Sequence, residues 1–202
     1  MKSATDPMLL DDVSELLFEA AKVSNHRRFV VAGSLSVIGA VMTPPREMTM
    51  SRDLDMYPEL DPGRGFQEIA SNLGENSAFH KSRGFYADPI SPQLLALPDG
   101  WEGRLGQIPT KGGVIALFIE PNDVAIGKLL RGNPNDMRWI EAGIAEGILN
   151  PDTMRHRAAL VTGIDFEELQ LIRSRLAPYL TSSDGLDDES EAPAKSWRSH
   201  TP

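Results

Sequence analysis

The sequence predicts an α+β protein in which helices flank a small sheet and a helical segment follows. The chain has 202 residues, a length that suits one domain with a helical appendage. Its first half contains short apolar or alternating segments separated by Gly and Pro, a pattern typical of strands and turns. Its second half contains repeated helix start signals, in which Asn, Asp or Pro stands at the beginning of a periodic segment.

These patterns predict three parts of the chain. Residues 1–120 form the α+β core, residues 121–180 form C-terminal helices that pack on the core, and residues 181–202 form a disordered acidic tail. The tail consists largely of Ser, Asp, Glu and Pro, so it has too few apolar side chains to offset the entropy cost of ordering.

Local periodicity predicts the order of elements. Residues 11–24 place apolar side chains on one helical face, and residues 29–32 form an apolar run typical of a buried strand. The small apolar residues 35–41 predict a short helix, and residues 50–58 alternate in polarity as a strand does. The later elements are predicted, in chain order, as a helix at 65–73, strands at 84–90, 104–108 and 113–119, and helices that begin near residues 122, 134, 151 and 165.

Composition excludes several functions. The 20 Lys and Arg against 29 Asp and Glu give a formal net charge of −9, which argues against general DNA binding and against a polybasic membrane surface. The chain has no Cys, which excludes a disulfide scaffold, a thiolate zinc site and a Cys nucleophile. The start of the chain lacks the apolar core of a signal peptide, and no apolar run approaches the roughly 18 residues of a membrane helix. We therefore expect a cytoplasmic protein with no membrane partner.

Asp53 and Asp55 are the most informative residues. Side chains two residues apart on a strand share a face, so both carboxylates can reach one pair of divalent ions, and those ions can bridge the phosphates of a nucleotide. Burying two acids for structure alone would cost charge repulsion and desolvation. The alternative is a solvated edge strand or turn, where Asp-x-Asp is common.

Gly33 and Ser34 form the predicted turn between a strand and a helix. Such a turn exposes backbone N–H groups that phosphate oxygens can bind, while Gly allows close approach and Ser adds a hydroxyl. Ser34 can equally cap the helix without any ligand.

The Gly-Ser turn and the segment 51–58, Ser-Arg-Asp-Leu-Asp-Met-Tyr-Pro, resemble the nucleotidyltransferase fold, whose pattern is Gly-Ser, a helix and then Asp-x-Asp. That fold is a small mixed sheet flanked by helices. More closely, the chain resembles the bacterial nucleotidyltransferase-like family DUF6036, and the resemblance covers roughly residues 26–160. The segments that resemble this family are 74–80, 84–88, 97–105 and 123–129.

The resemblance implies roles for individual residues. Gly33 and Ser34 would hold the triphosphate, while Asp53 and Asp55 would act as catalytic metal ligands. The third carboxylate of the fold comes from the following strand, and Asp88 matches it best because that strand should lie beside the Asp-x-Asp strand. Two alternatives for the third carboxylate, both near the end of a later strand, are Glu120 and Asp123.

Four further residues are candidates. Lys128 occupies the place where similar proteins keep a Lys that faces the nucleotide, although most helical Lys residues are simply solvated. Asp136 corresponds to a recurrent Lys-Asp or Arg-Asp position of the family, or caps the next helix. His80, predicted in a loop beside basic residues, can contact phosphate or substrate or be structural, and Arg52 adjoins Asp53.

The resemblance implies a nucleotidyltransferase that uses Mg²⁺ or Mn²⁺ and transfers a nucleoside monophosphate from an NTP to an RNA or protein hydroxyl. Some related enzymes act in toxin–antitoxin or abortive-infection systems, so a toxin or antitoxin partner is implied as well. The 18 residues between Ser34 and Asp53 exceed the usual gap of the fold by a loop, either a lid or a decoration. The alternatives are a non-catalytic, antitoxin-like interaction protein and a nucleotide-binding regulator.

Overall fold

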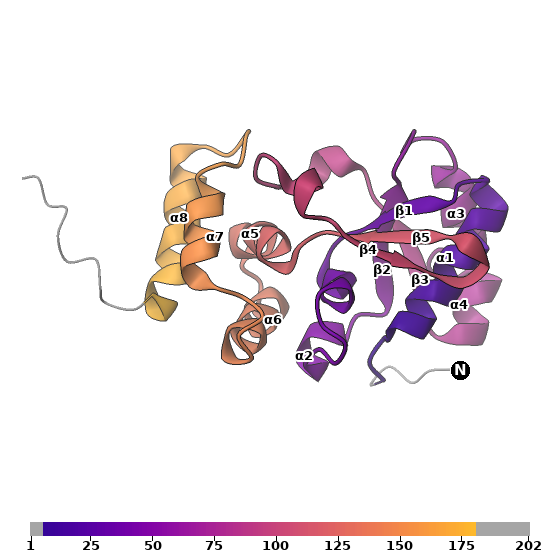
Figure 1. Ribbon diagram of the computed structural model, residues 1–202, viewed down its shortest axis with the longest axis horizontal. Helices are drawn as coiled ribbons and strands as arrows, with labels where there is room; N and C mark the ends of the chain where they lie inside the picture. The colour runs from indigo at the N-terminus through magenta and orange to yellow at the C-terminus, as the bar shows by residue number, and fades with distance from the viewer. Residues whose placement is uncertain (1–5, 181–202) are drawn as a thin grey trace, which may run out of the picture.

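The structure is a computed structural model that describes residues 6–180, and it is a mixed α/β arrangement (Figure 1). A five-stranded sheet is flanked by helices, and the helices at the C-terminal end stack beyond it, which confirms the predicted fold class. The predicted tail at 181–202 lies outside the described residues. The division at residue 120 stays a prediction.

The sheet combines parallel and antiparallel pairs in the order β3-β2-β1-β5-β4. β1 and β5 are parallel, as are β2 and β3, whereas β2 runs antiparallel to β1, and β4 to β5. The strands are β1 (Arg28–Val31), β2 (Asp53–Pro58), β3 (Tyr86–Pro89), β4 (Gly106–Pro109) and β5 (Ile115–Phe118).

Some helices pack on the sheet, and others stack beyond it. The α-helices are α1 (Leu10–Ser24), α2 (Arg46–Thr49), α3 (Phe66–Leu73), α4 (Ala78–Arg83), α5 (Pro121–Arg131), α6 (Pro134–Ala145), α7 (Pro151–Ala158) and α8 (Phe166–Leu176). The 3-10 turns are η1 (Ser34–Gly39), η2 (Pro92–Leu94), η3 (Trp101–Arg104), η4 (Lys111–Gly113) and η5 (Ala177–Tyr179). Within residues 6–180, every helix is too short or too polar to cross a membrane.

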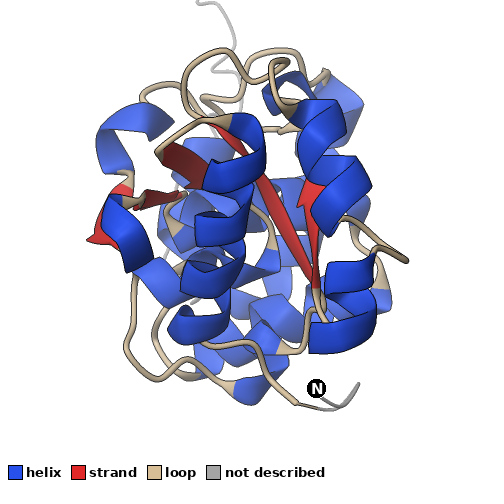
Figure 2. Ribbon diagram, turned by 90° about the vertical axis from the view of Figure 1, so that its right-hand side faces the viewer, coloured by secondary structure: helices blue, strands red, loops and turns tan. Residues whose placement is uncertain are grey.

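Two groups of helices lie at opposite ends of the molecule. α1, α3 and α4 cover the sheet at one end, and from that side they stand in front of the strands (Figure 2). α5 to α8 stack at the other end, where α5 contacts η1 and α6 contacts α2. The hydrophobic core is continuous between them, from Leu16 of α1 through Phe29 and Phe118 of the sheet to Trp139 of α6. The C-terminal helices therefore share the core of the sheet.

Several predicted elements differ in detail from the structure. The helix expected at 35–41 is the 3-10 turn η1, whose Gly39 lies so close to Phe118 that a Cβ there would come within 2.2 Å of the Phe118 Cβ. The strand expected from residue 104 begins at residue 106, because η3 occupies the preceding residues. α2 and α4 were not predicted, since helices of four and six residues are too short to show a helical period.

Candidate functional site

Three carboxylates lie together on one face of the sheet. β2 and β3 are parallel neighbours, and Asp55 pairs in register with Asp88. Asp53 lies two residues from Asp55 on the same face. Asp53, Asp55 and Asp88 each offer an oxygen, and these oxygens lie within 4.8 Å of one another. We call these three residues the acidic cluster.

The electrostatics of the acidic cluster favour a cation. Burial raises the pKa of Asp55 to about 6, and the charges of Asp53 and Asp88 add to the shift. The pKa of Asp88 is raised as well, first by burial and then by the charges of Asp53 and Glu75. Like charges held this close disfavour ionisation, so a divalent cation would relieve the repulsion. Oxygen atoms from carboxylates are also the ligands that Mg²⁺ prefers.

Neighbouring side chains orient the β2 end of the cluster. The Ser51 hydroxyl donates a hydrogen bond to Oδ1 of Asp53. Arg52 turns away from the cluster, and its Nε donates to the backbone oxygen of Gly84 at 2.9 Å. Arg52, which directly precedes β2, therefore binds the residue that ends α4. Ser51 was not predicted as part of the site.

Gly33 brings the end of β1 against the acidic cluster. It has a φ of +60°, a conformation that favours glycine, and it directly precedes η1. A Cβ at this position would lie 1.7 Å from Oδ2 of Asp55. Only a residue without a side chain allows the turn to approach the carboxylate this closely. The predicted Gly-Ser turn thus adjoins the predicted metal ligands.

Lys128 reaches the same turn from α5. Its Nζ donates to the Ser34 hydroxyl at 2.9 Å and to Oδ1 of Asp136 at 3.0 Å. The side chain is only 4% exposed, so the alternative of a solvated Lys is wrong. Burial lowers its pKa, and the hydrogen bond that Lys128 donates to Asp136 partly offsets that effect. The ammonium is therefore held in place at the Ser34 hydroxyl.

Asp136 is a buried anchor for two cations. Arg131 donates to both of its oxygens at 3.0 Å, in addition to the bond from Lys128. Burial raises the pKa of Asp136, but hydrogen bonds from Arg131 and Lys128 outweigh it and hold the pKa below its ordinary value. Asp136 does not cap its helix, because the side chain of Asn133 is the N-cap of α6.

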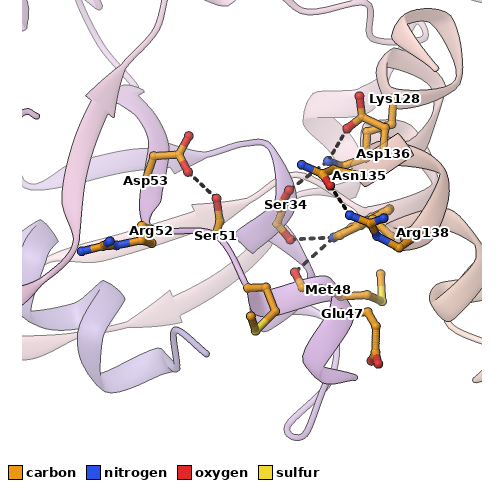
Figure 3. A pocket seen from close by; sticks show the side chains of 12 residues that line it. Ser34, Glu47, Met48, Ser51, Arg52, Asp53, Lys128, Asn135, Asp136 and Arg138 are labelled. Atoms are coloured by element: carbon orange, nitrogen blue, oxygen red, sulfur yellow. Dashed lines mark hydrogen bonds and ion pairs between the residues drawn. The ribbon is translucent and has the colours of Figure 1, made fainter. Parts of the chain in front are cut away.

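A cavity of about 670 Å³ opens beside these groups. Figure 3 shows Ser51 and Asp53 on one side of it, Lys128 and Asp136 on the other, and Ser34 between them. Trp139 forms part of its wall, and its indole N–H donates to the backbone oxygens of Ser34 and Met48, each at 3.1 Å. We call this cavity the cleft. Sequence reasoning missed Trp139, although its position three residues after Asp136 on a helix places the two side by side.

Glu120 and Asp123 lie elsewhere. The carboxylate of Glu120 caps α5 and pairs with Arg157. Asp123 is fully buried and pairs with Arg104 at 2.8 Å and with Arg157 at 2.9 Å. The structure therefore brings Asp88, and neither of the two alternatives, to the Asp-x-Asp pair.

His80 lies on α4, where the sequence predicted a loop. Its Nδ1 accepts a hydrogen bond from the backbone N–H of Asn76 at 3.0 Å. Its ring lies against Tyr86, with 4.6 Å between the ring centroids. His80 does not line the cleft.

A mixed sheet that joins a Gly-Ser turn to three clustered carboxylates is the arrangement expected of a nucleotidyltransferase-like protein. The chain belongs to the family described as nucleotidyltransferase of unknown function, DUF6036, whose model matches residues 9–171. This match confirms the resemblance and extends it at both ends. No curated protein and no solved structure matches the chain.

Proposed function

We propose that the protein is a Mg²⁺- or Mn²⁺-dependent nucleotidyltransferase that transfers a nucleoside monophosphate from an NTP to a hydroxyl group of RNA or protein. The observation that supports this most is the acidic cluster, whose oxygens lie within 4.8 Å of one another. The Gly-Ser turn adjoins it so closely that a Cβ on Gly33 would overlap Asp55. Phosphates on that turn would therefore lie next to the carboxylates.

Asp53, Asp55 and Asp88 fit a divalent cation. Their oxygen donors suit Mg²⁺ or Mn²⁺, and the raised pKa of Asp55 reflects negative charge that a cation would neutralise. When bound, the metal supplies positive charge that offsets the charge of the phosphates.

The cleft and Lys128 would hold the donor nucleotide. A volume of about 670 Å³ falls in the range of small-ligand sites. The Ser34 hydroxyl and the ammonium of Lys128 lie 2.9 Å apart, so both can contact the same phosphate group. Asp136 keeps that ammonium in position, since it is buried and bound to Lys128 at 3.0 Å. Lys128 thus acts as a fixed point charge for the phosphates.

Asp88 would take the proton from the acceptor. It is the exposed member of the acidic cluster, so an acceptor hydroxyl can reach its carboxylate. The acceptor oxygen forms a bond to the α-phosphorus, the bond from that phosphorus to the bridging oxygen of the β-phosphate breaks, and pyrophosphate leaves. The proton of the hydroxyl passes to Asp88. The protein groups named here all belong to this chain, and the resemblance implies a toxin or antitoxin partner in addition.

The experiment uses the full chain with Mg²⁺ and each of the four NTPs. Calorimetry measures Mg-NTP binding, and labelled NTPs are offered with RNA and protein acceptors. Asp53→Asn should abolish transfer, whereas Asp99→Asn, which changes an exposed acid outside the site, should not. Absence of both binding and transfer would refute the proposal. Binding without transfer would instead support a nucleotide-binding regulator, and a tight protein complex that survives Asp53→Asn would support a non-catalytic interaction protein.

A further inference from the structure

An aromatic pair adjoins the acidic cluster on the side away from the cleft. Tyr86 on β3 pairs in register with Asp53 on β2. Neighbours in register on parallel strands point to the same face, so Tyr86 shares the face of the three carboxylates. His80 lies against Tyr86 with ring centroids 4.6 Å apart and planes at 47°. Both residues remain partly exposed, and neither lines the cleft.

His80 is held in a defined orientation. The Ser77 hydroxyl accepts from the backbone N–H of His80 and caps α4. The His80 Nδ1 accepts from the backbone N–H of Asn76, so in the neutral ring the proton sits on Nε2. Next to it, Phe79 packs edge-on against the buried Phe85, with centroids 5.5 Å apart. The pair is therefore preorganised, with an N–H donor beside a flat aromatic ring.

Charged side chains of the acidic cluster and its neighbours act on the Tyr86 phenol. Burial raises the pKa of the Tyr86 phenol, and the charges of Asp53, Glu75 and Asp88 raise it further, while Arg52 acts in the opposite direction. Tyr86 therefore lies within electrostatic reach of the acidic cluster. Lys81, the residue after His80, is exposed on the same helix. α4 thus carries one exposed cation next to His80 in the sequence, and a nucleic acid phosphate could contact it.

The order of the strands separates donor and acceptor. Gly33 and Ser34 follow β1, and Lys128 follows β5, so all three lie on one side of β2. Tyr86 belongs to β3, on the other side of β2. In phosphoryl transfer the attacking and leaving oxygens are roughly in line across the phosphorus. If pyrophosphate leaves on the side of Lys128, the acceptor hydroxyl arrives on the side of Tyr86.

We propose that Tyr86 and His80 bind the 3′-terminal nucleotide of a single-stranded RNA, whose base stacks on the aromatic pair and whose ribose hydroxyl faces Asp88. This assignment rests on the proposed function and selects RNA as its acceptor. Aromatic side chains stack with any base because every base has a π-face. The ribose oxygen then forms the bond to the α-phosphorus, pyrophosphate leaves, and Asp88 takes the proton. A contact limited to the terminal nucleotide also agrees with a chain of net charge −9, since it neutralises few phosphates.

Direct binding tests this site without requiring turnover. A short 5′-fluorescent single-stranded RNA with a free 3′ end is titrated with the full chain and Mg²⁺, and its anisotropy is measured. Tyr86→Leu should weaken RNA binding about tenfold, because the stacking surface is lost. Tyr86→Phe keeps the ring and should stay within about twofold of the wild type. Tyr179→Leu is the matched control, since it removes a tyrosine of η5 and should leave RNA binding unchanged.

A second readout keeps the result independent of folding. Each variant is checked by its melting temperature and by its affinity for Mg-NTP, which Tyr86→Leu should leave within about twofold because Tyr86 lies outside the cleft. If Tyr86→Leu misfolds, His80→Gln replaces it, with the same expected loss of RNA affinity.

The failures of the two proposals are distinguishable. The RNA site would be overturned if RNA bound equally to the wild type and to Tyr86→Leu, or if RNA did not bind to the wild type. In that case, Mg-NTP binding and transfer to another acceptor would still support the proposed function. Label found only on a protein acceptor, whatever the residue at position 86, would also overturn it. If the wild type neither bound Mg-NTP nor transferred a nucleotide to any acceptor, the proposed function would be refuted. The anisotropy titration would still decide whether RNA binds at Tyr86 and His80.

Discussion

Asp55→Asn should stabilise the metal-free protein at neutral pH. The pKa of Asp55 rises from its ordinary value of 3.8 to about 6 on folding, chiefly because of burial and then because of its two acidic neighbours. The ionised carboxylate therefore destabilises the folded state. At 1.36 kcal/mol per pKa unit, the shift corresponds to about 2–3 kcal/mol of unfolding free energy that the neutral amide regains. For a chain of this size that gain raises the melting temperature by about 4–12 °C.

The sign of the effect sets its pH range. Because the folded-state pKa lies above the unfolded value, the folded state binds the proton more tightly between the two values. The stability of the wild type should fall as pH rises from about 4 to about 6, and the advantage of Asp55→Asn should grow over the same range. Below about pH 4 the carboxyl is protonated in both states, so the contribution of its ionisation disappears.

The assay is urea unfolding in EDTA at several pH values, repeated with Mg²⁺ at neutral pH. Mg²⁺ should stabilise the wild type by binding only the folded state, and it should have little effect on Asp55→Asn. Asp99→Asn serves as the control, because it changes an exposed acid and should give no pH-dependent difference. A variant that is less stable than the wild type in EDTA at pH 8, or a difference that does not vary with pH, would refute the reasoning.

Three further substitutions separate the parts of the site. Gly33→Ala places a Cβ 1.7 Å from a carboxylate oxygen at a φ of +60°, so it should lose about 1–3 kcal/mol in urea unfolding together with Mg²⁺ affinity; unchanged stability would contradict the close approach. Lys128→Met should lower Mg-NTP affinity at least about tenfold in calorimetry, whereas Asp136, still paired with arginine, should limit the loss of stability to about 1–3 kcal/mol. Asp123→Asn should lose about 3 kcal/mol of stability in urea unfolding and keep its Mg²⁺ affinity. Asp88→Asn should keep its stability and lose its Mg²⁺ affinity. The opposite pattern would restore Asp123 as the third carboxylate.

Local sequence patterns located the five strands to within a few residues and identified the part of the site that lies on β2 and after β1. Asp53 and Asp55 could be placed on one face because a strand has a period of two, and the Gly-Ser turn follows directly from the apolar run before it. Short elements were missed because they bury too few residues to show a period. α4, with no buried residue, is the clearest case, and its omission placed His80 in a loop.

Contacts between distant segments could not be predicted in the same way. Lys128 and Asp136 lie on different helices, and only the packing of α5 against α6 brings them within 3.0 Å. Trp139 contacts Ser34 across 105 positions of the chain, a relation that no local period records. Asp88 was favoured over its alternatives by the rule that consecutive strands tend to be neighbours, and the register of β2 and β3 agrees with it.

The indole of Trp139 makes the cleft optically observable. Its N–H bridges η1 and α2, and the ammonium of Lys128 lies 4.9 Å from its ring centroid. Tryptophan emission responds to charge and to solvent near the ring, so phosphates that bind the Lys128 ammonium would change the emission of Trp139. The chain has only two other Trp residues, Trp101 and Trp197, and replacing both with Phe would leave one intrinsic fluorophore in the wall of the cleft. Nucleotide binding would then be visible in the unlabelled protein, on the timescale of mixing, before any product forms.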